Sequence, residues 1–289
     1  VCSPWVVSLP RNGSDESTAL PLARRARQRA LGRAWERPAC SAVGGDWRLA
    51  LPSACALEFI HTYSLIHDDL PAMDDDTMRR GRPTLHVVAG EGMAILAGDA
   101  LLTEAFTLIV REPVSTDAAL TARKLRVVGL LASAAGAAGM VGGQAIDLAC
   151  VTPAPGQEPR PALDLAGLQH MHGKKTGALI RGAATIGAVM GGARDDVVLA
   201  IDEAAAELGL AFQIVDDILD VEGASAELGK TAGKDAAAGK PTYPALLGLA
   251  ASRERAAACL ARAESRLARL GLQSDHLVAL GRAMVERSR

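Results

Sequence analysis

The sequence predicts a single all-α domain, and three observations support this prediction. From Leu51 onward, apolar residues recur three and four positions apart, which is the spacing of one face of an α-helix. Alternating runs of the β-strand type are nearly absent. Aromatic residues make up only 3% of the chain, too few for a typical β-sandwich or β-barrel.

Four stretches of the chain show the helical spacing most clearly, and breaker residues separate them. The stretches are 50–67, 92–110, 201–221 and 253–272. The breakers are Pro71, Gly81 to Pro83, the proline-rich stretch 152–161 and the pair Gly191 and Gly192. Because no internal repeat of fixed period is present, one helical domain is the simplest organisation.

Residues 1–40 differ from the rest in composition, being rich in Arg, Ser, Pro and Ala. We expect an atypical, disordered or non-native N-terminal segment over 1–40 and a helical domain over 41–289. An alternative is that this basic segment is an arm that binds RNA or a membrane surface.

The charge balance and the cysteines exclude several classes of protein. The formal net charge is −2, whereas a nucleic-acid-binding domain is usually strongly basic. The five cysteines lie far apart without a CxxC pair, which indicates neither a disulfide framework nor a zinc site and suits a cytoplasmic location. The uncharged run 127–146 is long enough to span a membrane, but its many Gly and Ala residues insert weakly into lipid. We therefore expect no membrane span and no nucleic-acid partner.

Five carboxylates fall within a short segment, at Asp68, Asp69, Asp74, Asp75 and Asp76. Like charges at this density repel one another, and they follow the C-terminal end of a predicted helix, where the helix dipole disfavours anions. A cation should therefore bind there. Oxygen ligands without Cys or clustered His favour Mg²⁺. A solvated acidic turn is the alternative.

A second acidic cluster lies on the predicted helix over 201–221. Asp216, Asp217 and Asp220 are three and four residues apart and share one helix face, while their neighbours are apolar. A helix that merely exposes one polar face is the alternative. If both clusters face one cavity, they form a polynuclear Mg²⁺ site that holds a diphosphate, and nearby Lys and Arg residues would complete it. Neither a P-loop nor a GxGxxG fingerprint is present, so a nucleotide-binding fold is not indicated.

These motifs resemble those of the short-chain trans-polyprenyl diphosphate synthases, most of all the bacterial farnesyl diphosphate type. The first motif, DDxxxxD, comprises Asp68, Asp69 and Asp74, and the second, DDxxD, comprises Asp216, Asp217 and Asp220. Segments 90–102, 142–148, 175–181 and 240–249 also match, so the resemblance runs from about Leu51 to the C-terminus. A terpene cyclase usually carries an Asn/Ser/Glu-type metal motif in the second position, so the second DDxxD motif favours chain elongation.

The resemblance implies a helical bundle around a central cleft, a homodimer, and three Mg²⁺ ions that bridge the aspartates to an allylic diphosphate. Diphosphate leaves, the double bond of isopentenyl diphosphate attacks the allylic cation, and a proton is lost to the released diphosphate. The implied metal ligands are Asp68, Asp69, Asp74, Asp216, Asp217 and Asp220, of which Asp68, Asp69 and Asp216 are catalytic together with Lys175. The implied allylic diphosphate ligands are Arg79, Lys175, Thr176, Gln213, Lys230 and Lys240, and the isopentenyl diphosphate ligands are His61, Arg80 and Arg37.

The chain departs from this family near its N-terminus. The family carries GGKRxRP, whose Lys and last Arg bind isopentenyl diphosphate, whereas residues 31–38 read LGRAWERP here. Ala34 stands in the position of the Lys, and we assign Arg37 to the end of the motif. A non-catalytic or regulatory prenyl-synthase-like subunit is therefore a second interpretation.

Product length is expected to depend on Tyr63. This residue precedes Asp68 by five positions and therefore lies about 7.5 Å further along a helix from the metal site. In similar enzymes a bulky aromatic residue at this position closes the pocket at fifteen carbons. We predict farnesyl diphosphate as the product, with geranylgeranyl diphosphate as the alternative.

Overall fold

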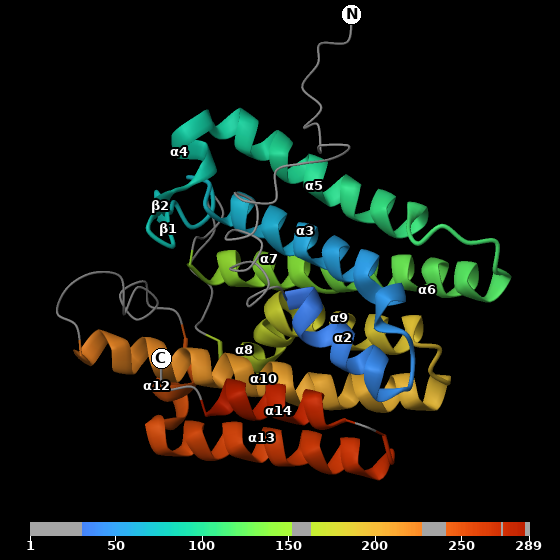
Figure 1. Ribbon diagram of the computed structural model, residues 1–289. Helices are drawn as coiled ribbons and strands as arrows, with labels where there is room; N and C mark the ends of the chain where they lie inside the picture. Colours follow the sequence, from blue (N-terminus) through green and yellow to red (C-terminus); the bar gives the residue numbers. More distant parts are fainter. Residues whose placement is uncertain (1–30, 152–162, 227–240, 273, 287–289) are drawn as a thin grey trace, which may run out of the picture. The chain divides into compact units, whose positions relative to one another are not determined.

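The computed structural model describes residues 31–151, 163–226, 241–272 and 274–286, and these residues are almost entirely helical (Figure 1). The helices are α2 (Leu31–Ala42), η1 (Trp47–Ala50), α3 (Leu51–Asp68), α4 (Leu85–Ala89), α5 (Glu91–Arg111), α6 (Ala118–Ala135), α7 (Met140–Val151), α8 (Leu165–His172), the π-helical turn η2 (Gly173–Gly177), α9 (Ala178–Met190), α10 (Asp195–Ala226), α12 (Tyr243–Leu247), α13 (Leu249–Arg269) and α14 (Asp275–Val285). Among the described residues, the only strands are β1 (Met78–Arg79) and β2 (Arg82–Pro83). The prediction of an all-α fold is confirmed.

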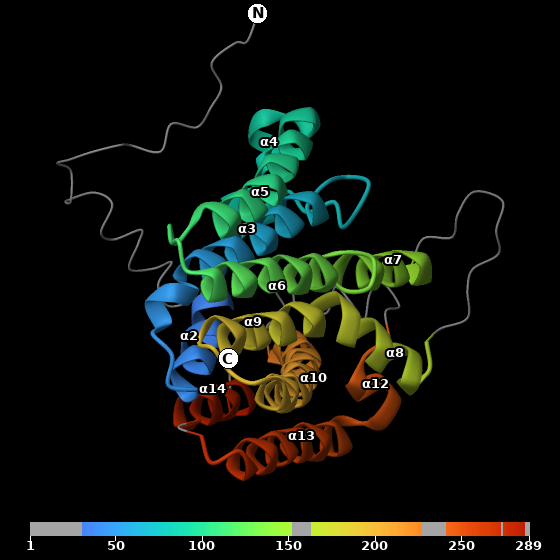
Figure 2. The ribbon, with the colours of Figure 1, turned by 90° about the vertical axis from the view of Figure 1, so that its right-hand side faces the viewer.

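Helix α9 is the most deeply buried element in the described part of the chain. Every residue from Gly182 to Met190 is buried, because α9 contacts α2, α6 and α10. Figure 2 shows α9 lying between α6 and α10. Its sequence, ALIRGAATIGAVM, is dominated by small and aliphatic residues, which allow neighbouring helices to approach closely.

The contact between α2 and α9 is a contact between backbones. A Cβ atom added at Gly187 would lie 2.3 Å from the carbonyl oxygen of Glu36, closer than side chains and backbone approach in proteins. Trp35, Ala39 and Cys40 on the same helix are buried in the core. Residues 31–40 of α2 fall inside the stretch 1–40 that the sequence analysis sets apart, and in the structure they pack as part of the unit from residue 31 onward.

Two groups of helices flank this core. Helix α5 packs along α3, while α10, α13 and α14 lie side by side (Figure 1). Ion pairs join α10 to α13: Arg266 to Glu203, and Arg262 to Glu207 with a shortest distance of 2.8 Å. These pairs are largely exposed to solvent, so they fix the register of the two helices more than they stabilise the fold.

Three helical spans of the described chain are long and apolar enough to cross a membrane, judged by length and composition alone: Trp47–Asp68, Glu91–Arg111 and Ala118–Cys150. The uncharged run 127–146 is not one continuous helix, because α6 ends at Ala135 and α7 begins at Met140. The absence of a membrane span stays a prediction.

Candidate active site

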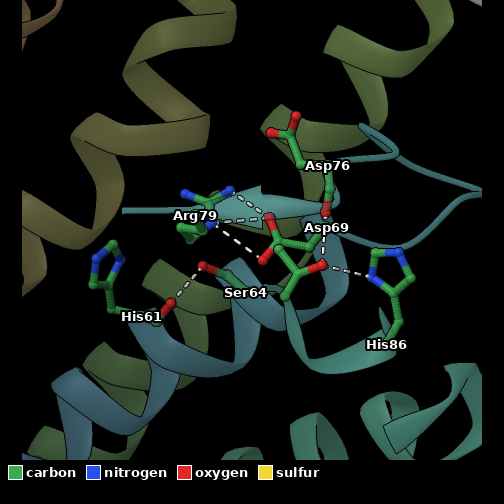
Figure 3. Close-up of polar contacts among 7 residues, drawn as sticks. His61, Ser64, Asp69, Asp76, Arg79 and His86 are labelled. Atoms are coloured by element: carbon green, nitrogen blue, oxygen red, sulfur yellow. Dashed lines mark hydrogen bonds and ion pairs between the residues drawn. The ribbon is translucent and has the colours of Figure 1, made fainter. Parts of the chain in front are cut away.

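The first acidic cluster lies at the C-terminal end of α3, where a short hairpin folds back onto it. In the turn between β1 and β2, Arg80 and Gly81 have φ values of +52° and +74°, the conformation of a type I′ turn. This turn returns Arg79 to the end of α3, where its guanidinium donates to both oxygens of Asp69 at 2.8 and 3.1 Å from Nε and 2.7 Å from Nη2 (Figure 3). Because Asp69 is buried and both of its carboxylate oxygens accept hydrogen bonds from Arg79, Asp69 orients Arg79 in this structure.

Asp68, the last residue of α3, has a half-buried carboxyl group with a raised pKa. Burial has the largest effect and raises the pKa of Asp68, Lys175 and Arg79 lower it, and the charges of Asp74 and Asp69 raise it, which gives a pKa of about 6. The negative charge on Asp68 is therefore incompletely compensated by the protein itself. A divalent cation bound to this oxygen would supply the missing positive charge.

His61 lies near enough to Arg79 and Arg80, beside this cluster, for their charges to affect it. His61 lies on α3 two turns before Asp68, and its pKa is lowered by burial and then by the charges of Arg80 and Arg79. A neutral imidazole near two guanidinium groups suits an anionic ligand. It can donate a hydrogen bond to the anion without repelling the two arginines, as a protonated imidazole would. The assignment of His61 and Arg80 to an isopentenyl diphosphate subsite stays a prediction.

Arg37, the third residue predicted for that subsite, lies elsewhere. Its guanidinium stacks over the ring of Trp47 at 4.7 Å from the ring centroid, just before the N-terminal end of α3. His61 is ten residues further along α3 than Leu51, which corresponds to about 15 Å of helix. The structure therefore does not bring Arg37 to His61, because the register of α2 directs it to the opposite end of α3.

Lys175 projects from the π-turn η2 and connects several elements of the site. Its ammonium group donates to Asp147 on α7, with 2.5 Å between Nζ and Oδ2, and its charge also acts on Asp68. The side chain of Asp147 is only 8% exposed. Sequence reasoning did not single out Asp147, although an acidic residue within the apolar segment 142–148 was a signal that could have identified it.

The second acidic cluster approaches Lys175 through the rings of Tyr243 and His172. The backbone N–H of Tyr243 donates to Oδ2 of Asp217 at 2.9 Å. The Tyr243 ring lies 5.7 Å from the ring of His172. The charge of Asp147 raises the pKa of His172, and that of Lys175 lowers it. Contacts therefore connect Asp217 to His172 through Tyr243, and the charge of Lys175 acts on both His172 and Asp68.

The remaining predicted residues of α10 lie on one helix and differ in their exposure. Gln213, Asp217 and Asp220 are half-buried, and Asp216 is exposed. Thr176 is half-buried within η2, next to Lys175. The predicted ligands Lys230 and Lys240 lie outside the described residues.

Within the described ranges, no three His, Cys, Asp or Glu side chains converge on a point that could hold a metal ion. The donor set nevertheless fits Mg²⁺, which commonly takes one or two carboxylates and completes its shell with water and phosphate oxygens. Asp68, with its raised pKa and partial burial, is the carboxylate best suited to this role.

His172 makes the stability of the protein depend on pH. Burial lowers the pKa of His172 from 6.5 to about 4, opposed by the charge of Asp147 and assisted by that of Lys175. Between these pH values the unfolded chain binds more protons, so stability falls as the pH falls. We expect the wild type to lose on the order of 3 kcal/mol more than His172→Gln between pH 6.5 and pH 4 in urea titrations. The exposed variant His276→Gln should follow the wild-type curve, and equal losses in wild type and His172→Gln would contradict this assignment.

The helical fold is that of the isoprenoid synthases, and residues 31–270 match the polyprenyl synthetase family. The chain belongs to this family.

Its relatives differ in the product that their names state. The chain is 50% identical over 229 residues to geranylfarnesyl diphosphate synthase of Leucosceptrum canum, covering 79% of this chain and 61% of that protein. It is 48% identical over 226 residues to farnesyl diphosphate synthase of Geobacillus stearothermophilus, covering 78% and 73%. The structure of geranylgeranyl pyrophosphate synthetase from Pyrococcus horikoshii matches with a TM-score of 0.77 at 29% identity, covering 93% of this chain and 88% of that one. The chain thus spans about three fifths of the first of these relatives, and the names cover products of different lengths.

Proposed function

We propose that the protein is a Mg²⁺-dependent trans-prenyltransferase that condenses isopentenyl diphosphate with an allylic diphosphate, either dimethylallyl or geranyl diphosphate. The observation that carries this proposal is the position of Lys175 between the two acidic clusters. Its charge acts on Asp68 and on His172, and His172 and Tyr243 lead to Asp217. Membership of the polyprenyl synthetase family supports it.

The residues of the site divide between the two substrates. Three Mg²⁺ ions are expected with substrate bound, and when bound they supply positive charge to the departing diphosphate. Asp68, Asp69 and Asp74 from the first cluster, and Asp216, Asp217 and Asp220 from the second, would hold them, some through water. Arg79, held by Asp69, and Lys175 would bind the allylic diphosphate. Their fixed positions mean that little reorganisation is needed as charge develops on the leaving group.

Isopentenyl diphosphate is proposed to bind between His61 and Arg80. Losing the contacts that the family's N-terminal motif would make costs about 10- to 100-fold in affinity for a charged partner. We therefore expect a high KM for isopentenyl diphosphate, with the reaction itself retained.

Incubation of the protein with labelled isopentenyl diphosphate, geranyl diphosphate and Mg²⁺ tests this function. An elongated diphosphate, absent when EDTA replaces Mg²⁺, is the expected product. A hydrocarbon or alcohol formed without isopentenyl diphosphate would instead indicate a terpene cyclase. Inactivity alone, with activity restored by a catalytic partner, would indicate the regulatory subunit.

We propose farnesyl diphosphate as the product because of Tyr63. Its side chain is 7% exposed and makes an edge contact with His67, at 5.6 Å between ring centroids. The Nε2 atom of His67 lies 3.0 Å from the carbonyl oxygen of Ile95 on α5, which holds the pair between the two helices. Geranylgeranyl diphosphate is the alternative product.

Tyr63→Ala is expected to lengthen the product by at least one five-carbon unit, because removal of the ring opens space beyond the fifteen-carbon chain. Chromatographic sizing of the dephosphorylated products measures this. Phe106→Ala, on α5, serves as a control for the loss of an aromatic ring elsewhere in the core. If Tyr63→Ala gives a product of unchanged chain length, Tyr63 does not form the floor of the pocket.

We further propose a homodimer in the cytoplasm. Helices α4 and α5 expose several large apolar side chains, among them Val88 at 70%, Leu96 at 61% and Val110 at 67%. Apolar surface of this kind favours association with a second copy. Sedimentation equilibrium at several concentrations distinguishes a dimer from a monomer of 29.9 kDa.

A further inference from the structure

Helix α7 carries two successive glycines where it meets the π-turn, and their roles differ. A Cβ atom added at Gly142 would lie 2.0 Å from the carbonyl oxygen of Ala137, just before its own helix. A Cβ atom added at Gly143 would instead lie 2.1 Å from the backbone nitrogen of Lys175 and 2.5 Å from its Cα. Only glycine at position 143 therefore allows the π-turn to rest on α7 in this place.

Asp147 lies one helical turn after Gly143 and faces the same π-turn. Its Oδ2 accepts a hydrogen bond from Nζ of Lys175 at 2.5 Å. Lys175 is thus fixed at both ends. Its backbone packs directly against the Gly143 backbone, and its ammonium group donates a hydrogen bond to Asp147.

The π-turn itself accounts for why such support is needed. Hydrogen bonds from i to i+5 change the register between α8 and α9, and single π-turns within helices occur frequently at functional sites. An unsupported turn of this kind would relax toward α-helical geometry and carry Lys175 away from Asp68, on which its charge now acts.

We infer that Gly143 is a positioning residue for the allylic diphosphate, acting through Lys175. Its missing side chain sets the place of the Lys175 backbone, and Asp147 directs the ammonium group toward the first acidic cluster. This inference rests on the proposed function, in which Lys175 binds the leaving diphosphate.

A double-mutant cycle tests this, with calorimetric binding of inorganic diphosphate in the presence of Mg²⁺ as the readout. Gly143→Ala should weaken binding by about 10- to 100-fold, and Lys175→Ala should weaken it by a similar factor. The double variant should bind no more weakly than Lys175→Ala, because Gly143 acts only through that lysine. With geranyl diphosphate as substrate, Gly143→Ala should raise the KM for geranyl diphosphate and leave that for isopentenyl diphosphate unchanged.

Three controls separate positioning from damage to the fold. Gly129→Ala adds a methyl group on α6 where no atom lies within 4 Å, and should leave diphosphate binding unchanged. Gly142→Ala disturbs the start of α7 without touching Lys175, so its effect on binding should add to that of Lys175→Ala. Asp147→Asn adds no heavy atom, so it tests how Lys175 is positioned even if Gly143→Ala does not fold. This variant should weaken diphosphate binding at least about threefold.

The outcomes distinguish this inference from the proposed function. Wild-type protein that binds no diphosphate with Mg²⁺ would overturn both. If the wild type binds diphosphate, any one of three results would overturn the positioning role alone. Gly143→Ala could bind with unchanged affinity, or the loss in the double variant could be additive. The third such result is that Asp147→Asn binds as tightly as the wild type or more tightly.

Discussion

Asp68→Asn is expected to lower the rate of chain elongation by about a thousandfold or more. The amide keeps the shape of the side chain but removes the charged oxygen proposed to hold Mg²⁺, and several kcal/mol of transition-state stabilisation correspond to such a factor. Steady-state rates with isopentenyl and geranyl diphosphates at saturating Mg²⁺ measure the loss.

The stability of this variant provides an independent check. Because burial raises the pKa of Asp68 to about 6, the carboxylate destabilises the metal-free fold at neutral pH, and a neutral amide should not. Without Mg²⁺, Asp68→Asn should therefore be at least as stable as the wild type. Asp275→Asn, an exposed substitution in the first turn of α14, should retain the full rate. A wild-type rate in Asp68→Asn would refute the assignment of this metal ligand.

Gly187→Ala is expected to destabilise the fold by about 2–3 kcal/mol. The added methyl group would lie 2.3 Å from the carbonyl oxygen of Glu36, so α2 and α9 must separate, which is the effect of overpacking a core. Urea unfolding followed by circular dichroism measures the change.

The sign of this effect decides whether α2 packs on α9. Within a helix, alanine is more favourable than glycine by about 0.5–1 kcal/mol when nothing obstructs it. Gly129→Ala, at an open position of α6, should therefore stabilise the protein. If Gly187→Ala stabilises the protein in the same way, the backbone contact with α2 is absent and the N-terminal residues pack differently.

Hydrophobic spacing was sufficient to predict the all-α fold, because three- and four-residue periodicity reports directly on a buried helix face. The acidic clusters were predictable for a similar reason, since charges among apolar neighbours require compensation. Tyr243 escaped prediction because its contribution to the site is a backbone N–H group, which no side-chain pattern reveals.

Other features depend on backbone geometry that local sequence specifies weakly. The π-turn at Gly173–Gly177 has a hydrogen-bonding pattern that apolar spacing does not distinguish from an α-helix. The pairing of Arg79 with Asp69 follows from two residues with positive φ in one turn. Arg37 was misplaced because a short motif predicts residue type, whereas the direction of a side chain follows from the register of the whole helix.

Crystals grown with Mn²⁺ and inorganic diphosphate test the central claim most directly, because the anomalous scattering of Mn²⁺ distinguishes the bound ions from water molecules. We predict ions that bridge one diphosphate to Asp68 on one side and Asp216 on the other, with Lys175 in contact with the phosphate oxygens. Ions bound at one cluster only, or a diphosphate that touches neither cluster, would contradict the account.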